Sequence, residues 1–227
     1  MTRTFRVAAM MASVFWAGSA IAQTPSAAEP KSTEPTITFA YVGGNVGLAV
    51  VEKASAAGGI DAGMRVWRNL DGIGELTWAG NVVTGRQLSR ASNLAGAIGA
   101  NQGALAEGSI KGAALYTGLG ARWVFENIEI KGFRLYVLGT VGSARVALKP
   151  SFTLAGSNIT DTISQYGVTL GKDLAGNYWH DAFTAGLGAV KGQGSWYFDG
   201  SLRLTSIGGA GQRTNVPRLA LGGGRRF

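Results

Sequence analysis

The residues best suited to acid–base chemistry are the single histidine and its neighbours. His180 lies beside Asp181, and Ser164 precedes both in the same segment. A hydroxyl, an imidazole and a carboxylate that meet can cleave an ester. Neighbouring residues of a strand point to opposite faces, so His180 and Asp181 are poorly placed to act together. The chain also has no cysteine, which excludes thiolate chemistry and cysteine-based metal sites. We therefore predict no catalytic site, no metal site and no cofactor.

A second kind of chemistry, the pairing of opposite charges, is suggested by ionic residues that alternate with apolar ones. These residues are Arg65, Glu75, Arg122, Asp199 and Arg203. If they share a dry interior, the acids gain by pairing with the arginines. We expect a charge network in which Glu75 and Asp199 meet the three arginines. The sequence leaves open the alternative that each charge lies near a rim and is solvated separately.

The segment from Gly112 to Leu148 shows which elements must hold these charges. Every second residue from Ala113 to Phe125 is mainly apolar, and the interleaved residues include tyrosine, arginine and glycine. The same period of two restarts at Phe133 after a polar link at 126–132. This period is typical of β-strands, so the segment predicts a long hairpin with one apolar and one polar face.

The remaining alternating segments extend this hairpin into a barrel. They cover 36–51, 60–70, 75–84, 181–190, 196–205 and 216–227. The connections at 71–74, 126–132 and 191–194 are short, whereas those at 52–59, 86–111, 149–180 and 208–215 are longer. We read 86–111 as a loop, and the sequence leaves open a helix or strand extensions in 86–111 and in 149–180. The sequence therefore predicts an all-β protein, an eight-stranded antiparallel up-and-down transmembrane barrel over 36–227.

The N-terminal 35 residues have a different character. A basic start with Arg3 and Arg6, an apolar run and a small-residue site at 20–22 predict a signal peptide over 1–22. The alternative is a membrane anchor, but the run is shorter than the roughly 20 residues of a spanning helix. Residues 23–35 are rich in proline and polar residues, which predicts a flexible spacer.

The net charge of +8 falls to about +6 once Arg3 and Arg6 are removed. These charges are scattered and form no basic patch, so we expect no nucleic-acid partner. The phosphates of lipopolysaccharide are better suited to the exposed basic side chains. The chain also contains 36 glycines, many at alternate positions, where they can leave room for bulky neighbours inside a narrow barrel.

Alternation alone does not say which face is inside, because a soluble barrel would bury the apolar set. The apolar set has aromatic residues beside the short turns, as a membrane interface favours. We expect a periplasmic aromatic girdle of Trp123, Phe125, Phe133, Trp196 and Phe198. Exposing an arginine at the bilayer midplane costs about 2–4 kcal/mol, so we place the charges in the lumen. Eight strands enclose little more than their own side chains, which predicts a filled lumen.

Four motifs in this order resemble the small, porin-like outer-membrane β-barrel family, which includes the transmembrane domain of outer membrane protein A, outer membrane protein X and the opacity proteins. The motifs are 41–47 (YVGGNVG), 118–123 (GLGARW), 186–189 (GLGA) and the terminal Phe227. The resemblance implies a bacterial outer-membrane location, insertion by the barrel-assembly machinery, and a C-terminal assembly signal of Leu219, Leu221 and Phe227. Arg225 departs from the pattern, because the family usually has an apolar residue there.

The leading prediction for function is a non-enzymatic barrel that serves envelope structure or surface interaction through its extracellular loops. Its expected partners are outer-membrane lipid, lipopolysaccharide, the assembly machinery and a surface ligand that the sequence does not identify. Two alternatives stay open at this stage. One is a narrow channel for ions or small solutes, and the other is a lipid-modifying enzyme that would use His180.

Overall fold

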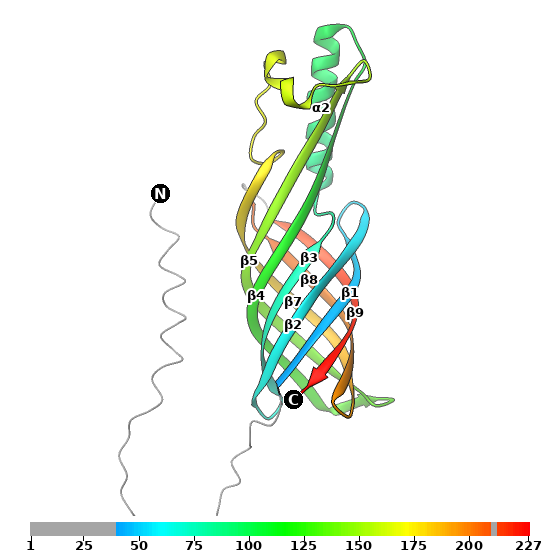
Figure 1. Cartoon of the computed structure of the whole chain (residues 1–227), viewed down its shortest axis with the longest axis vertical. Helices are drawn as coiled ribbons and strands as arrows, with labels where there is room; N and C mark the ends of the chain where they lie inside the picture. Colours follow the sequence, from blue (N-terminus) through cyan, green and yellow to red (C-terminus); the bar gives the residue numbers. More distant parts are fainter. Residues whose placement is uncertain (1–39, 210–212) are drawn as a thin grey trace, which may run out of the picture. The chain divides into compact units, whose positions relative to one another are not determined.

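The structure, a computed structural model, describes residues 40–209 and 213–227 (Figure 1). The expected signal peptide at 1–22 and spacer at 23–35 lie outside the described residues, as do residues 36–39 of the first expected strand. No helix of the described part is both long and apolar enough to cross a membrane.

Eight strands form one closed antiparallel barrel. They are β1 (Ala40–Val50), β2 (Ala54–Trp67), β3 (Leu70–Ala79), β4 (Ala106–Ile130), β5 (Phe133–Leu154), β7 (Gly176–Gln193), β8 (Trp196–Ile207) and β9 (Thr214–Arg226). Each strand pairs with the next, and β1 pairs with β9 to close the sheet. Closure satisfies the backbone groups that a free edge would leave unpaired. The predicted all-β, eight-stranded antiparallel barrel is therefore confirmed.

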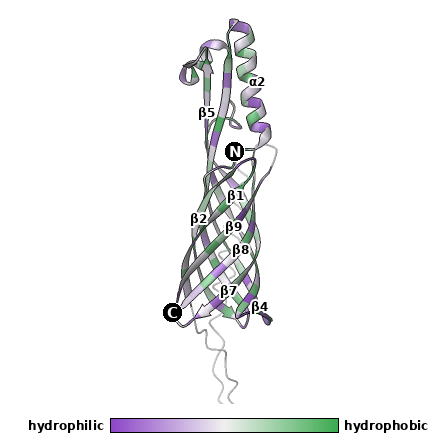
Figure 2. Cartoon of the chain, turned by 90° about the vertical axis from the view of Figure 1, so that its right-hand side faces the viewer, coloured by the Kyte–Doolittle hydropathy of each residue, from purple (hydrophilic) through white to green (hydrophobic). Residues whose placement is uncertain are grey.

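Two strands of the barrel are much longer than the others. β4 has 25 residues and β5 has 22, whereas the last residue of β3, Ala79, pairs with Ala114 of β4. The hairpin therefore continues past the barrel, and helix α2 (Gly85–Gln102) packs against it (Figures 1 and 2). The two-residue strand β6 (Ser157–Asn158) and the 3₁₀-helix η1 (Thr160–Tyr166) complete this extension. We call residues 80–112 and 148–175 the arm.

The arm has its own hydrophobic core. Its buried members are Val83, Ala91, Ala95, Ile98, Ile110, Leu148, Phe152, Ile159, Ile163 and Leu174. Helix α2 approaches β4 closely because Gly108 has no side chain, and a Cβ there would lie 2.2 Å from the carbonyl oxygen of Ala91. Phe152, a member of this cluster, is fully buried.

The expectation that residues 86–111 form a loop is wrong, because most of them form α2 and the start of β4. Thr84 caps the helix: its hydroxyl accepts a hydrogen bond from the Gln87 amide, and the Gln87 side chain accepts one from the Thr84 amide at 3.0 Å. Gly103 ends the helix in the left-handed conformation at φ 63°. The expectation that 149–180 connects two strands is also too simple, because β5 continues to Leu154 and β7 begins at Gly176.

Several connections between strands differ from the predicted ones. The turn after β2 consists of Arg68 and Asn69, so residues 71–74 lie inside β3. β2 starts at Ala54, which leaves only residues 51–53 between it and β1. The link expected at 126–132 shrinks to Lys131 and Gly132, whose positive φ values of 52° and 83° suit a tight hairpin turn. We call the end with the turns at 68–69, 131–132 and 194–195 the short-turn end.

Candidate functional site in the barrel lumen

The barrel exposes its apolar face and buries its ionic face. Leu119 is 72% exposed, Val137 44% and Leu202 50%, whereas Arg122 is 8% exposed and Arg203 4%. A soluble barrel would show the opposite arrangement, with the leucines and valines inside. The orientation predicted from aromatic and charged residues is the one that the structure has.

One layer of ion pairs lies around Arg203 of β8. Its guanidinium donates to both carboxylate oxygens of Asp61 at 3.0 Å and to Glu75 at 2.9 Å. Arg218 of β9 approaches the same oxygen of Glu75 at 3.6 Å, and the Thr140 hydroxyl donates to the other. Four strands thus contribute charges to one buried cluster, in which Arg203 has two carboxylate partners and Arg218 has only Glu75 among the described residues.

A second layer lies nearer the short-turn end and is organised by Asp71 of β3. Arg122 donates to one oxygen of Asp71 at 2.8 and 3.1 Å, and Arg65 donates to the other. The Arg122 guanidinium also lies over two tyrosine rings, 4.3 Å from the centroid of Tyr41 and 5.3 Å from that of Tyr136. Arg122 is therefore held by a carboxylate and by cation–π contacts together.

Asp199 is not paired with the arginines that it was expected to meet, although it lines the same small cavity as Arg122 and Arg203. It accepts a hydrogen bond from the Tyr136 hydroxyl at 2.9 Å, and its other oxygen has no hydrogen-bond partner among the described residues. It forms no ion pair with those residues. The structure thus brings Glu75 and Arg203 together and pairs Arg65 and Arg122 through Asp71, while Asp199 pairs with a tyrosine.

Three charged lumen residues, Asp61, Asp71 and Arg218, were missed by the sequence analysis. Asp71 was assigned to a turn, and it is fully buried in β3. Asp61 stands two residues before Gly63 in the lumen-facing set of β2, so alternation could have identified it. Arg218 stands between two buried residues of β9 at the same spacing, Val216 and Ala220, and could have been found in the same way.

Glycines make room for the four tyrosine rings that fill much of the lumen. A Cβ at each of four glycines would lie between 2.0 and 2.6 Å from a ring atom or hydroxyl of a tyrosine. The pairs are Gly43 with Tyr197, Gly63 with Tyr41, Gly118 with Tyr116, and Gly188 with Tyr136. A larger residue at any of these positions would displace the neighbouring tyrosine ring.

Between the ion pairs and the arm, the lumen is closed by an apolar layer. This layer consists of Ala49, Ala57, Ala79, Val82, Ala114, Tyr116, Ala144, Ala182, Ile207 and Val216, all buried. Next to the ion pairs, the cavity lined by Asp61, Asp199 and Arg203 has a volume of about 10 Å³, enough for about one water. The described lumen thus holds two layers of ion pairs, four tyrosine rings and an apolar layer.

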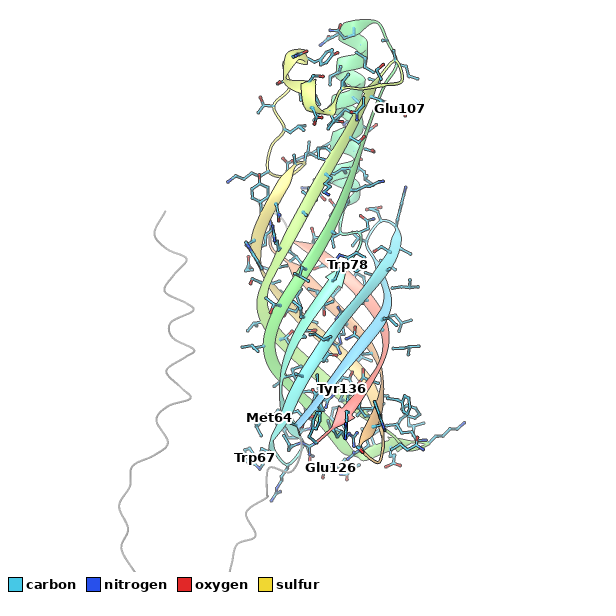
Figure 3. All side chains as sticks on the ribbon, viewed as in Figure 1. Met64, Trp67, Trp78, Glu107, Glu126 and Tyr136 are labelled. Atoms are coloured by element: carbon cyan, nitrogen blue, oxygen red, sulfur yellow. The ribbon has the colours of Figure 1, made fainter. Side chains whose placement is uncertain are left out.

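Aromatic residues gather on the outside at the short-turn end. The expected girdle residues Trp123, Phe133, Trp196 and Phe198 are exposed, and Phe125 is half-buried. Trp67 stands two residues after the lumen-facing Arg65 but is 66% exposed, because the register shifts between Arg65 and Trp67 (Figure 3). The expected assembly-signal residues Leu219, Leu221 and Phe227 are exposed as well.

The residues weighed for ester chemistry do not meet. His180 and Asp181 are adjacent in β7, where His180 has the lumen-facing parity and Asp181 faces outward. The Asp181 carboxylate accepts a hydrogen bond from Arg213 at 2.9 Å. Ser164 belongs to η1 in the arm. In the described part of the chain, no hydrogen bond joins any two of these three side chains.

A closed sheet with an apolar exterior and a buried ionic interior defines a transmembrane β-barrel. The chain matches no protein-family model and no curated protein. Among solved structures it is similar to Neisserial surface protein A, with 13% identity, a TM-score of 0.48 and coverage of 83% of this chain and 96% of that one.

Two further solved structures are similar to the chain. The attachment invasion locus protein of Yersinia pestis has 12% identity and a TM-score of 0.43, over 84% of this chain and 99% of that one. The N-terminal β-barrel domain of OprF from Pseudomonas aeruginosa has 15% identity and a TM-score of 0.42, over 82% and 97%. At these values the similarities do not bear on function.

Proposed function

We propose that the chain is a non-enzymatic integral protein of the bacterial outer membrane, with a closed lumen and an arm that meets other molecules at the cell surface. The observation that carries this proposal is the arm, which has a hydrophobic core separate from the barrel. A hairpin and an 18-residue helix with their own core are more than a connection between two strands requires. Such a rigid extension suits the presentation of a binding surface.

The exterior of the barrel supports the membrane part of the proposal. Lipid contacts the exposed apolar residues of the strands, and the aromatic girdle lies at the periplasmic interface. Basic side chains beside the girdle, such as Arg225 and Lys191, reach the phosphates of lipid headgroups. The longer connections, including the arm, then face outward, where lipopolysaccharide is the first partner.

The remaining expected partner is the barrel-assembly machinery. We propose that the barrel-assembly machinery recognises the C-terminal strand through Leu219, Leu221 and Phe227, which are exposed on one face of β9 and at its end. Arg225 interrupts this apolar face.

The packed lumen supports a closed barrel more than a narrow channel. An ion would have to pass two layers of buried charges and then the apolar layer. We expect no stepwise conductance when the purified protein is reconstituted in planar bilayers. Reproducible unitary currents that change in an Arg203→Met variant would instead favour the channel.

An epitope insertion tests the surface part of the proposal. A short epitope between Gly103 and Leu105, at the exposed tip of the arm, should be detected by antibody on intact cells. The matched control is the same epitope at the turn of Lys131 and Gly132, which should be detected only after the outer membrane is permeabilised. Detection of the control epitope alone on intact cells would overturn the proposed orientation.

A further inference from the structure

A cavity lies where the arm meets the barrel, and the proposed function leaves it without a role. Its volume is about 390 Å³, within the range of small-molecule sites. The residues that line it come from the start of α2, the start of β7, residues 146 and 148 of β5, the end of β8 and the start of β9. We call it the vestibule.

The vestibule has an apolar base. Val82, Val146, Leu148 and Ile207 line it, and Val82 and Ile207 also belong to the apolar layer that closes the lumen. Below the vestibule the barrel is therefore packed, so a molecule that enters cannot pass through. The cavity is a blind pocket that can hold a molecule about the size of a monosaccharide.

The walls of the vestibule are basic. Arg86 and Arg90 of α2 and Lys172 of the arm line it, against one acid, Asp173. Asp173 is already paired with Arg90, and its backbone carbonyl accepts a hydrogen bond from Gln87 at 2.9 Å. Neither Arg86 nor Lys172 forms an ion pair with a described residue, so two cations remain available to an anion.

Aromatic side chains line the vestibule as well. Tyr178 and Trp179 of β7 line the vestibule, and the Lys172 ammonium lies 5.6 Å from the centroid of the Tyr178 ring. An aromatic face packs well against the C–H face of a sugar ring, while neighbouring cations bind an attached anionic group. The vestibule therefore offers an apolar and aromatic surface for the sugar ring and two available cations for the anionic group.

We propose that the vestibule binds a sugar that carries a phosphate or sulfate group, with the anion held by Arg86 and Lys172 and the ring packed on Tyr178. This inference rests on the proposed function, because it gives the surface barrel a ligand class and a site. The same chemistry has two sources: phosphorylated sugars of lipopolysaccharide in the same membrane, and soluble sugar phosphates or sulfates from outside.

The test uses the full mature chain in nanodiscs of phospholipid alone, with glucose 6-phosphate as the probe and glucose as the uncharged control. Isothermal titration should show saturable binding of glucose 6-phosphate that weakens in 1 M salt, and weaker or no binding of glucose. Heat-modifiable migration of the same sample shows that the barrel is folded. Absence of binding by a folded, inserted barrel overturns the site and leaves the proposed membrane function intact.

Paired variants locate the binding. The double variant Arg86→Gln/Lys172→Gln should weaken binding of glucose 6-phosphate about tenfold, because it removes two charged hydrogen-bond donors. Lys149→Gln is the matched control: it removes an exposed cation of the arm that does not line the vestibule. Equal losses in the two variants would overturn the assignment of the site.

Nanodiscs that contain lipopolysaccharide distinguish the two sources. If lipopolysaccharide occupies the vestibule, these discs should suppress binding of the probe, and enzymatic removal of its phosphates should restore binding. If the ligand comes from outside, binding of the probe should be the same with and without lipopolysaccharide. Both results are consistent with an anionic sugar in the vestibule. The first assigns this sugar to lipopolysaccharide, and the second assigns it to a soluble source outside the cell.

Discussion

Replacing Glu75 with Gln removes one charge from the centre of the lumen and keeps the size of the side chain. Glu75 is fully buried and lies 2.9 Å from Arg203 and 3.6 Å from Arg218. Arg203 keeps Asp61 as a second partner at 3.0 Å. Arg218 has no other carboxylate within ion-pair distance among the described residues, so the variant leaves it as a buried cation without a counter-ion.

The size of the effect follows from this difference between the two arginines. Removing one partner of a buried ion pair costs about 3–5 kcal/mol, because the remaining charge is neither solvated nor paired. We expect Glu75→Gln to lower the free energy of unfolding by an amount in this range. The double variant Glu75→Gln/Arg218→Met removes the stranded cation and should recover at least about 2 kcal/mol, a coupling that a double-mutant cycle measures.

Equilibrium urea unfolding in lipid vesicles, followed by tryptophan fluorescence, measures these differences. Asp199→Asn is the matched control, because Asp199 is also a lumen acid but only accepts a hydrogen bond from Tyr136. We expect this control to cost about 1 kcal/mol. If Glu75→Gln cost no more than Asp199→Asn, and the double variant recovered nothing, the lumen charges would be solvated independently and the reasoning would be wrong.

Three further predictions test packing and assembly. Gly188→Ala should destabilise the barrel by about 1–3 kcal/mol in the same urea assay, because the new Cβ would lie 2.4 Å from Tyr136. The control Gly139→Ala should be neutral, because a Cβ at that position has no neighbour within 4 Å. Equal effects of the two substitutions would refute this prediction. Phe152→Ala should destabilise the arm core by about 3–5 kcal/mol. Limited proteolysis should therefore cut the arm faster, while the barrel keeps its heat-modifiable migration. Unchanged cleavage would count against a separate arm core. Arg225→Leu should speed insertion by purified assembly machinery, and an unchanged rate would show that the basic residue does not matter.

The barrel could be predicted because its signal is local. A period of two along a strand decides which side chains share a face, whatever the partner strands are. Leu119 and Arg122 therefore fall on opposite faces in the sequence and in the structure. The apolar residues and aromatic rings of the outward set then decide which face meets lipid.

The partners inside the lumen could not be predicted in the same way. Alternation places Asp199 and Arg203 in the lumen, but the level of each residue along the barrel depends on the stagger between strands. The structure pairs Arg203 with Asp61 and leaves Asp199 to Tyr136. The lumen position of Asp71 was missed for a simpler reason. An Asp-Gly pair is a common turn signal, but here it lies within β3, where Asp71 pairs with Arg65 of β2.

The sequence contains a signal for helix α2 of the arm, but the loop-like composition of the segment led us to overlook it. The segment is rich in glycine, alanine, serine and asparagine, which suggests a loop. Yet Thr84 followed three residues later by Gln87 is a capping box, and Leu88, Ala91, Ala95 and Ile98 follow at helical spacing. Its docking on β4 is a property of the folded chain and could not be predicted.

The central claim is that apolar side chains of this barrel face lipid and its charges face the lumen. Because the chain has no cysteine, a single nitroxide label can be attached at Leu202→Cys or at its neighbour Ser201→Cys. Collision rates with oxygen and with a water-soluble nickel complex, measured in nanodiscs, report the surroundings of each label. We predict high oxygen and low nickel collision for position 202, and an immobilised, inaccessible label at position 201. A mobile, oxygen-accessible label at 201 with an inaccessible one at 202 would contradict the account.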